Sequence, residues 1–215
     1  VLQAAAGYLG MCGTAEGEMA KIPLPLIDIL AGHQIKEGVL MALLRRERTG
    51  KGGFVTVSLL EAAVSALANQ GANWLIGQHI PGPMGVLHPS IAPYGDLFEG
   101  ADGRKLILAV GTEKHFRRLC ESLGHAEWVS DPRFADNHAR VTHRKELDDL
   151  LAPVFRQRPI DEWVDLLGEK GVPVGKVRNI REVFDHPLAR KMVLKGTFDE
   201  QKEAEVVRTV AFHLK

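Results

Sequence analysis

The stretch TGKGGFVTVSLLE at residues 49–61 decides how the first part of the chain is organised. Its glycines predict a tight turn, and the alternating, β-branched run 54–58 that follows is typical of a strand. Ser58 and Glu61 have the spacing of a capping box, which predicts that a helix begins directly after this strand. The stretch therefore predicts a strand that joins two helices.

The two helices beside this strand are predicted from their apolar residues. Before the strand, Ile35, Val39 and Leu43 recur every four positions, which indicates a helix over about 27–48. We expect that apolar face to be buried. After the strand, residues 59–77 carry little charge, so we expect a helix there that is buried on several sides or packed against another chain.

A loop rich in proline and glycine, residues 79–95, separates this part from the rest of the chain. A segment of that length without periodicity is typical of a linker or a functional loop, so we place a domain boundary here. Beyond it, periodicity and turn signals predict both helices and strands, which assigns the chain to the α/β class. The predicted elements are a hairpin from 96–98 and 104–110, helices over about 113–123, 137–156 and 160–170, a strand over 172–177 and a second hairpin over about 195–213.

Composition and charge exclude several classes of function. Lys plus Arg and Asp plus Glu are balanced at 27 each, so nothing indicates a nucleic acid or an anionic membrane surface as partner. No apolar run reaches the about 18 residues that a transmembrane helix needs. Cys12 and Cys120 lack metal-ligand spacing and fit unpaired thiols in a reducing compartment. We therefore expect a cytoplasmic protein without a metal site.

The N-terminal residues do not resemble a secretory signal, because they lack a basic start and glycines dilute their apolar run. The chain begins with Val1 and not with Met, which leaves open the interpretation that it is a processed or truncated piece of a longer protein.

Three places are candidates for chemistry, and each has a structural alternative. Asp28 stands at the start of the first predicted helix, where it either caps the helix, the commoner role, or faces a cleft. The segment 82–89 is either a mobile lid with His88 as a hydrogen-bond donor or an inert linker. Glu113 stands at a strand-to-helix junction, where an acid more often complements the helix dipole than serves an active site.

Five short motifs follow one another along the chain. They are DILAG at 28–32, LLRRERTGKG at 43–52, VTVSLLE at 55–61, HPSIAPY at 88–94 and GVPVG at 171–175. In this order and at these distances they resemble the class III CoA-transferases, the carnitine dehydratase and bile-acid-inducible (CaiB/BaiF) group, over about residues 1–195. The stretch 72–94 and the run DNHARVTHRKE at 136–146 are similar to enzymes that move CoA between dicarboxylates, such as succinyl-CoA:glutarate CoA-transferases.

This resemblance implies a nucleophilic mechanism. In the family, the aspartate that opens the D-x-x-x-G motif attacks an acyl-CoA thioester, and it corresponds to Asp28. The CoA then passes to a carboxylic acid through an aspartyl-CoA intermediate, which requires that water be excluded. A glycine-rich lid covers the aspartate in family members, and Gly82 to Gly85 lies in the matching region. His88 and Glu113 are further candidates for substrate or lid contacts.

The resemblance also implies an architecture and a set of partners. Residues 1–68 correspond to the end of a Rossmann-like large domain, 69–84 to a linker, 85–186 to a small α/β domain and 187–215 to a return segment towards the large domain. Family members are longer than this chain and form interlinked homodimers. Their N-terminal half supplies most contacts to CoA, which is a substrate and not a permanently bound cofactor.

Two alternatives remain beside the transferase. The segment VGTEKHF at 110–116 resembles the glutamate-bearing segment of α-methylacyl-CoA racemases, in which Glu113 would move a proton, although the motif at 88–94 favours the transferases. The other alternative is an inactive fragment, or a subunit that needs a separate N-terminal half.

Overall fold

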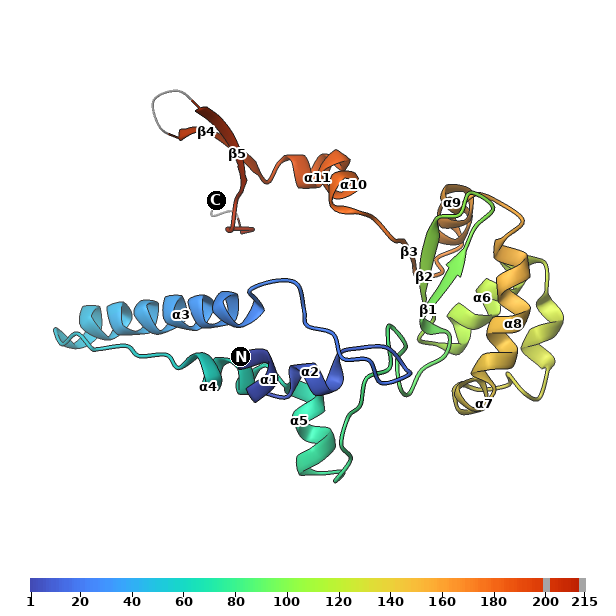
Figure 1. Cartoon of the computed structure of the whole chain (residues 1–215), viewed down its shortest axis with the longest axis horizontal. Coiled ribbons are helices and arrows are strands. Elements are labelled where there is room, and N and C mark those ends of the chain that lie inside the picture. The colour runs from blue at the N-terminus through green and yellow to red at the C-terminus, as the bar shows by residue number, and fades with distance from the viewer. Residues whose placement is uncertain (199–201, 213–215) are drawn as a thin grey trace. The chain divides into compact units, whose positions relative to one another are not determined.

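The structure of the protein is a computed structural model that describes residues 1–198 and 202–212. The chain divides into two compact units, Val1–Ser90 and Ile91–Lys215 (Figure 1). This division falls inside the loop rich in proline and glycine. The domain limits expected from the resemblance remain predictions, and the return segment 187–215 lies partly outside the described residues.

The first unit is built from helices. They are α1 (Leu2–Ala5), α2 (Tyr8–Met11), α3 (Leu26–Thr49), α4 (Leu59–Ser65) and α5 (Ala68–Leu75). Helix α3 confirms the prediction, and it ends at Gly50, whose φ of 70° is the left-handed conformation that glycine adopts readily. After α3 the chain runs back beside the helix (Figure 1), and the Val55 side chain lies so close to Gly38 that a larger residue there would collide with it.

Two predictions of secondary structure for the first unit are wrong. The run 54–58 is extended, but it pairs with no other segment of this unit, and a strand requires a neighbour that completes its hydrogen bonds. The predicted helix 59–77 is divided into α4 and α5, because Ala68 has a φ of 48° that interrupts the helix. The start of α4 is as predicted, since Ser58 Oγ accepts a hydrogen bond from the backbone N–H of Glu61 at 3.3 Å.

Little of the first unit is buried. Its buried cluster consists of Ala6, Tyr8, Ile27 and Ala63, and the Tyr8 hydroxyl donates to the Ala63 carbonyl at 2.9 Å. The predicted burial of the apolar face of α3 is wrong for the described chain, because the apolar side chains on it keep much of their surface exposed. The exposed side chains on α3 include Ile35, Val39, Leu40, Met41, Leu43 and Leu44, at 40% to 66% exposure.

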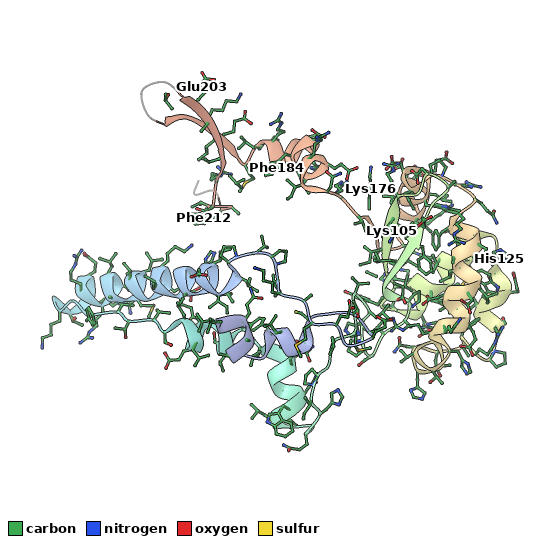
Figure 2. All side chains as sticks on the ribbon, in the orientation of Figure 1. Lys105, His125, Lys176, Phe184, Glu203 and Phe212 are labelled. Carbon is green, nitrogen blue, oxygen red and sulfur yellow. The ribbon has the colours of Figure 1, made fainter. Side chains whose placement is uncertain are left out.

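The second unit contains a three-stranded antiparallel sheet in the order β1 (Tyr94–Glu99), β2 (Lys105–Ala109), β3 (Val174–Lys176). Lys105 and Lys176, labelled in Figure 2, lie on the neighbouring strands β2 and β3. The helices of this unit are α6 (Glu113–Leu123), the 3-10 helix η1 (Ala126–Ser130), α7 (Asn137–Thr142), α8 (Arg144–Phe155), α9 (Ile160–Glu169), α10 (Ile180–Asp185) and α11 (Pro187–Arg190).

Most predictions for the second unit are confirmed. The first hairpin, α6, α9 and β3 lie where the sequence places them, and β4 (Val193–Phe198) pairs with β5 (Lys202–Val207) as the second hairpin. The predicted helix 137–156 is interrupted at His143, whose ψ of 29° breaks it into α7 and α8. The end of the second predicted hairpin, residue 213, lies outside the described residues.

The core of the second unit lies between the sheet and its helices. Leu106 and Leu108 of β2 are fully buried, and the Phe155 ring stacks on Phe98 at a centroid distance of 4.8 Å. Cys120 is part of this core, and burial raises the pKa of its thiol to about 12, which makes it an unreactive packing residue. None of the described helices has both the length and the apolar character required to span a bilayer.

Candidate functional site

Asp28 lies in the first turn of α3. The helix begins after Pro25, and no side chain caps it, so Asp28 does not have the capping role considered from the sequence. Ile27 and Ala31 are buried, which fixes this end of the helix, whereas the Asp28 side chain is exposed. Within the described chain, the Asp28 carboxylate forms no hydrogen bond or ion pair. The structure therefore presents an accessible carboxylate at a rigid helix terminus.

Gln3 holds the segment that leads into α3. Its side-chain Nε2 donates to the Ile22 carbonyl at 3.1 Å, and its Oε1 accepts from the Ile22 backbone N–H at 2.9 Å. This pair of bonds satisfies both backbone polar groups of Ile22, which lies outside any helix or strand. Gln3 was not predicted, because nothing in the local sequence indicates a contact between residues nineteen positions apart.

Gly82 and Gly85 line one cavity of the first unit. The cavity has a volume of about 640 Å³ and lies between α5 and the loop 79–90, with Gln70, Asn73 and His79 among its polar side chains. Gly85 has a φ of 63°, which favours glycine, and its N–H donates to the Gly13 carbonyl at 2.8 Å. The loop is thus attached to the N-terminal segment at Gly85.

His88 is hydrogen-bonded within its own loop. Its Nδ1 accepts a bond from the Ser90 backbone N–H at 3.1 Å. A ring nitrogen that accepts carries no proton, so the proton of the neutral imidazole is on Nε2. This tautomer is the one in which His88 can donate a hydrogen bond from Nε2.

Glu113 forms an ion pair with Arg140 in the second unit. Its carboxylate oxygens accept from Arg140 Nη1 at 2.8 Å and Nη2 at 2.7 Å. The Arg140 side chain is 1% exposed and that of Glu113 is 56% exposed. The bonds from Arg140 lower the pKa of Glu113 below its ordinary value. Glu113 therefore remains a charged acceptor that holds a buried arginine.

The candidate residues are only partly brought together. Gly82 and Gly85 share a cavity, Asp28 and His88 are not part of its lining, and Glu113 belongs to the second unit. In the part of the chain that the structure describes, no group of three His, Cys, Asp or Glu side chains is placed to hold a metal ion.

Arg140 and Arg144 are the residues that sequence reasoning missed in the second unit. Both are strongly paired, Arg140 with Glu113 and Arg144 with Asp96 at 3.0 Å. The run 136–146 was noted for its resemblance, but its spacing did not show which residues these arginines would contact.

Comparison with known proteins places the chain in a family. The model of CoA-transferase family III matches residues 1–215. An acyl-CoA transferase of Fusarium pseudograminearum is 38% identical over 201 residues, which are 93% of this chain and 44% of the relative. A succinate–glutarate CoA-transferase of Agrobacterium fabrum is 33% identical over 187 residues, which are 87% of this chain and 46% of the relative.

Solved structures of the same family share the fold. A CaiB/BaiF family protein from Brucella suis aligns with a TM-score of 0.77 at 32% identity, covering 98% of this chain and 58% of that protein. Rv3272 from Mycobacterium tuberculosis aligns with a TM-score of 0.82 at 30% identity, covering 99% of this chain and 54% of that protein. The chain thus spans about half the length of the relatives it matches. Since the family model and the fold both match along essentially the whole chain, the protein belongs to CoA-transferase family III.

Proposed function

We propose that this chain is part of an enzyme that transfers CoA from an acyl-CoA thioester to a carboxylic acid, with Asp28 as the nucleophile. The observation that carries the proposal is the family match over residues 1–215, together with an exposed carboxylate at the first position of the DILAG motif. Relatives bear the names succinate–glutarate CoA-transferase and acetyl-CoA:oxalate CoA-transferase. Short dicarboxylates are therefore the proposed class of acceptor.

The surroundings of Asp28 suit a nucleophile. The carboxylates of Asp96 and Glu113 are each occupied by an arginine, whereas Asp28 has no such partner in the described chain. The first turn of the 24-residue helix α3 offers backbone N–H groups and the positive end of the helix dipole, which favour negative charge. Both the carboxylate and the oxyanion formed on attack are stabilised by such an environment.

The proposed reaction has four steps. The Asp28 carboxylate attacks the thioester carbonyl and expels CoA thiolate, which gives a mixed anhydride. The thiolate attacks the Asp28 carbonyl, which forms an aspartyl-CoA thioester and releases the donor acid. The acceptor carboxylate attacks this thioester to give a second anhydride and CoA thiolate. The thiolate then attacks the acceptor carbonyl, which releases the new acyl-CoA and restores Asp28. The thioester energy is retained throughout because each bond broken is replaced by an activated acyl bond.

Water must be kept from the anhydrides, and the loop 79–90 is the proposed lid. Gly82 and Gly85 allow it to turn, and His88, with its proton on Nε2, is a proposed donor to a substrate carboxylate. We propose in addition that the enzyme acts as a cytoplasmic homodimer, with the CoA thioester as substrate and no resident cofactor.

The racemase alternative is disfavoured by the pairing of Glu113. A residue that moves a proton needs a pKa near the working pH, but the bonds from Arg140 lower the pKa of Glu113. No observation in the structure favours a racemase over a transferase.

The test is covalent trapping of the intermediate. The chain is incubated with succinyl-CoA, and the intact mass and peptide map are measured before and after treatment with hydroxylamine. We expect an adduct on Asp28 that hydroxylamine removes, no adduct in Asp28→Asn, and a normal adduct in Glu37→Gln, which changes an exposed carboxylate of the same helix.

An adduct on another carboxylate, or one that persists in Asp28→Asn, would contradict the proposal. An adduct that forms on Asp28 only after a second polypeptide is added would support the alternative of a subunit that needs a separate N-terminal half.

A further inference from the structure

Three side chains hold the backbone that directly follows the loop 79–90. The Ala92 N–H donates to Asn137 Oδ1 at 3.2 Å, and Arg140 Nε donates to the Ala92 carbonyl at 2.9 Å. Arg144 Nη2 donates to the Ile91 carbonyl at 2.6 Å. We call Asn137, Arg140 and Arg144 the loop anchor. It comes from α7 and the first residue of α8, within the run 136–146 to which the trapping chemistry at Asp28 assigns no role.

The anchor is rigid because each arginine is fixed on its other side. Arg140 is paired with Glu113 and lies over the Phe116 ring at 4.4 Å, and its side chain is 1% exposed. Arg144 is paired with both oxygens of Asp96, at 3.0 and 3.1 Å, and Asp96 is also 1% exposed. Each guanidinium group is thus held by a carboxylate, and that of Arg140 by an aromatic ring as well.

Stability alone does not account for this arrangement. In each of the two ion pairs one partner is buried, Arg140 in the first and Asp96 in the second. Burying a charge carries a desolvation cost, and well-packed apolar residues often stabilise a protein about as well. Arginine pairs differ from apolar packing in that they fix geometry, since their donors meet particular acceptors at particular angles. Here the acceptors that remain after pairing are the carbonyl of Phe134, which accepts from Arg140 Nη1 at 3.0 Å, and the carbonyls of two consecutive residues, Ile91 and Ala92.

The fixed backbone restricts His88 more than the glycines of the loop. An extended chain spans at most about 3.5 Å per residue, so His88, three residues before Ile91, stays within about 11 Å of it. Gly82, nine residues before Ile91, can lie up to about 30 Å from Ile91 by the same measure. The anchor therefore limits the position of His88 more closely than that of Gly82.

We infer that Asn137, Arg140 and Arg144 are positioning residues that fix the C-terminal end of the loop 79–90 and thereby set the place of His88. They act through the backbone of Ile91 and Ala92 and do not touch the substrate. The inference rests on the proposed function, in which this loop excludes water from an acyl group on Asp28.

Hydrogen exchange followed by mass spectrometry tests the anchor without relying on activity. We compare peptides that cover 86–93 and 105–109 in the parent, Asn137→Ala, Asn137→Asp and Arg140→Lys. Asn137→Asp keeps an oxygen acceptor for the Ala92 N–H, and Arg104→Lys is the matched control, because Arg104 bridges Asp102 and Asp161 elsewhere in the same unit.

We expect exchange in 86–93 to be at least tenfold faster in Asn137→Ala and Arg140→Lys, to return to the parent rate in Asn137→Asp, and to be unchanged in Arg104→Lys. Exchange in 105–109 should stay at the parent rate in all four variants. Unchanged exchange in 86–93, or a rise of equal size in both peptides, would overturn the inference. If Arg140→Lys does not fold, the two variants of Asn137 decide the result.

The lifetime of the Asp28 adduct is the second readout. In Asn137→Ala the adduct should hydrolyse about tenfold faster than in the parent, with Asn137→Asp restoring its lifetime. An unchanged lifetime in Asn137→Ala would overturn the positioning role. If the parent itself forms no adduct, the proposed function fails, while hydrogen exchange still decides whether the anchor holds the loop.

Discussion

The two units differ in how they use the same kind of residue. In the second unit, leucines such as Leu106 and Leu151 are fully buried between a sheet and its helices. In the first unit, Leu43 and Leu44 of α3 occupy equally regular positions on a helix and are 40% and 44% exposed. Apolar periodicity was present in both, but only the second unit supplies the surface that covers it.

The large buried core and the proposed nucleophile lie in different units. The proposed nucleophile Asp28 is exposed in the unit with the small core, and the acid Glu113 is committed to an ion pair in the unit with the large core. A large exposed apolar face is typical of an interaction surface. We therefore expect changes in the second unit to affect folding, and changes on α3 of the described chain to affect it little.

The largest expected loss in the free energy of unfolding comes from a substitution in the core of the second unit. Phe155→Ala removes a ring that stacks on Phe98 and meets Trp163 edge to face at 5.4 Å. Loss of a buried phenylalanine leaves a cavity, so the free energy of unfolding should fall by about 3 to 5 kcal/mol. Urea denaturation followed by tryptophan fluorescence measures it, and a loss below 1 kcal/mol, which is about the cost of a single buried methylene, would contradict the core described for this unit.

A smaller effect is expected at the Glu113 to Arg140 pair. Glu113→Gln leaves the buried guanidinium without its counter-charge, which should lower the free energy of unfolding by about 2 kcal/mol, less than for a fully buried pair because Glu113 is half exposed. The same variant should form the Asp28 adduct at the parent rate once folded. Loss of adduct formation in a folded Glu113→Gln protein would assign Glu113 to the chemistry instead.

A pH effect follows from Asp148, whose carboxyl lies close to Asp96. Burial and the negative charge of Asp96 together raise the pKa of Asp148 to about 7. The folded state thus binds a proton that the unfolded chain releases near pH 4, so the free energy of unfolding should decrease as the pH rises from about 4 to 7. The expected decrease in the free energy of unfolding is about 1 kcal/mol, and it should be absent in Asp148→Asn. Equal slopes for parent and variant between pH 4 and 7 would show that Asp148 is not the group responsible.

The smallest change in the free energy of unfolding is expected for a substitution on α3. Leu43→Ala changes a side chain that is already 40% exposed, so the free energy of unfolding should change by less than about 0.5 kcal/mol. Urea denaturation under the conditions used for Phe155→Ala gives the comparison directly. A loss of 2 kcal/mol or more, the size of a buried leucine's contribution, would show that the face of α3 is covered in solution.

Local signals predicted the elements whose ends are fixed by nearby residues. Helix α6 begins after Thr112, whose side chain accepts from the His115 backbone N–H, and ends at Gly124, which has a φ of 80°. Both signals lie within a few residues of the helix, so the sequence alone was sufficient.

Contacts between residues that are far apart in the sequence could not be predicted from local patterns. The run 54–58 has the composition of a strand, but composition does not supply a neighbouring strand, and the first unit has none. Glu113 and Arg140 are separated by 27 positions, and their pairing depends on how α6 and α7 meet. Asp28 was selected through family resemblance, since its local sequence favoured a helix cap.

Transfer of oxygen tests the central proposal most directly. In the proposed sequence, the bridging oxygen of the second anhydride comes from the acceptor carboxylate and stays on Asp28 when CoA leaves with the acceptor. We would allow turnover of succinyl-CoA with an acceptor acid labelled with heavy oxygen in its carboxylates, and then map the peptides by mass. We predict that the peptide containing Asp28 gains one heavy oxygen atom in a single turnover and up to two after many turnovers, and that other peptides gain none. Formation of labelled acyl-CoA while Asp28 remains unlabelled would contradict a nucleophilic role for this residue.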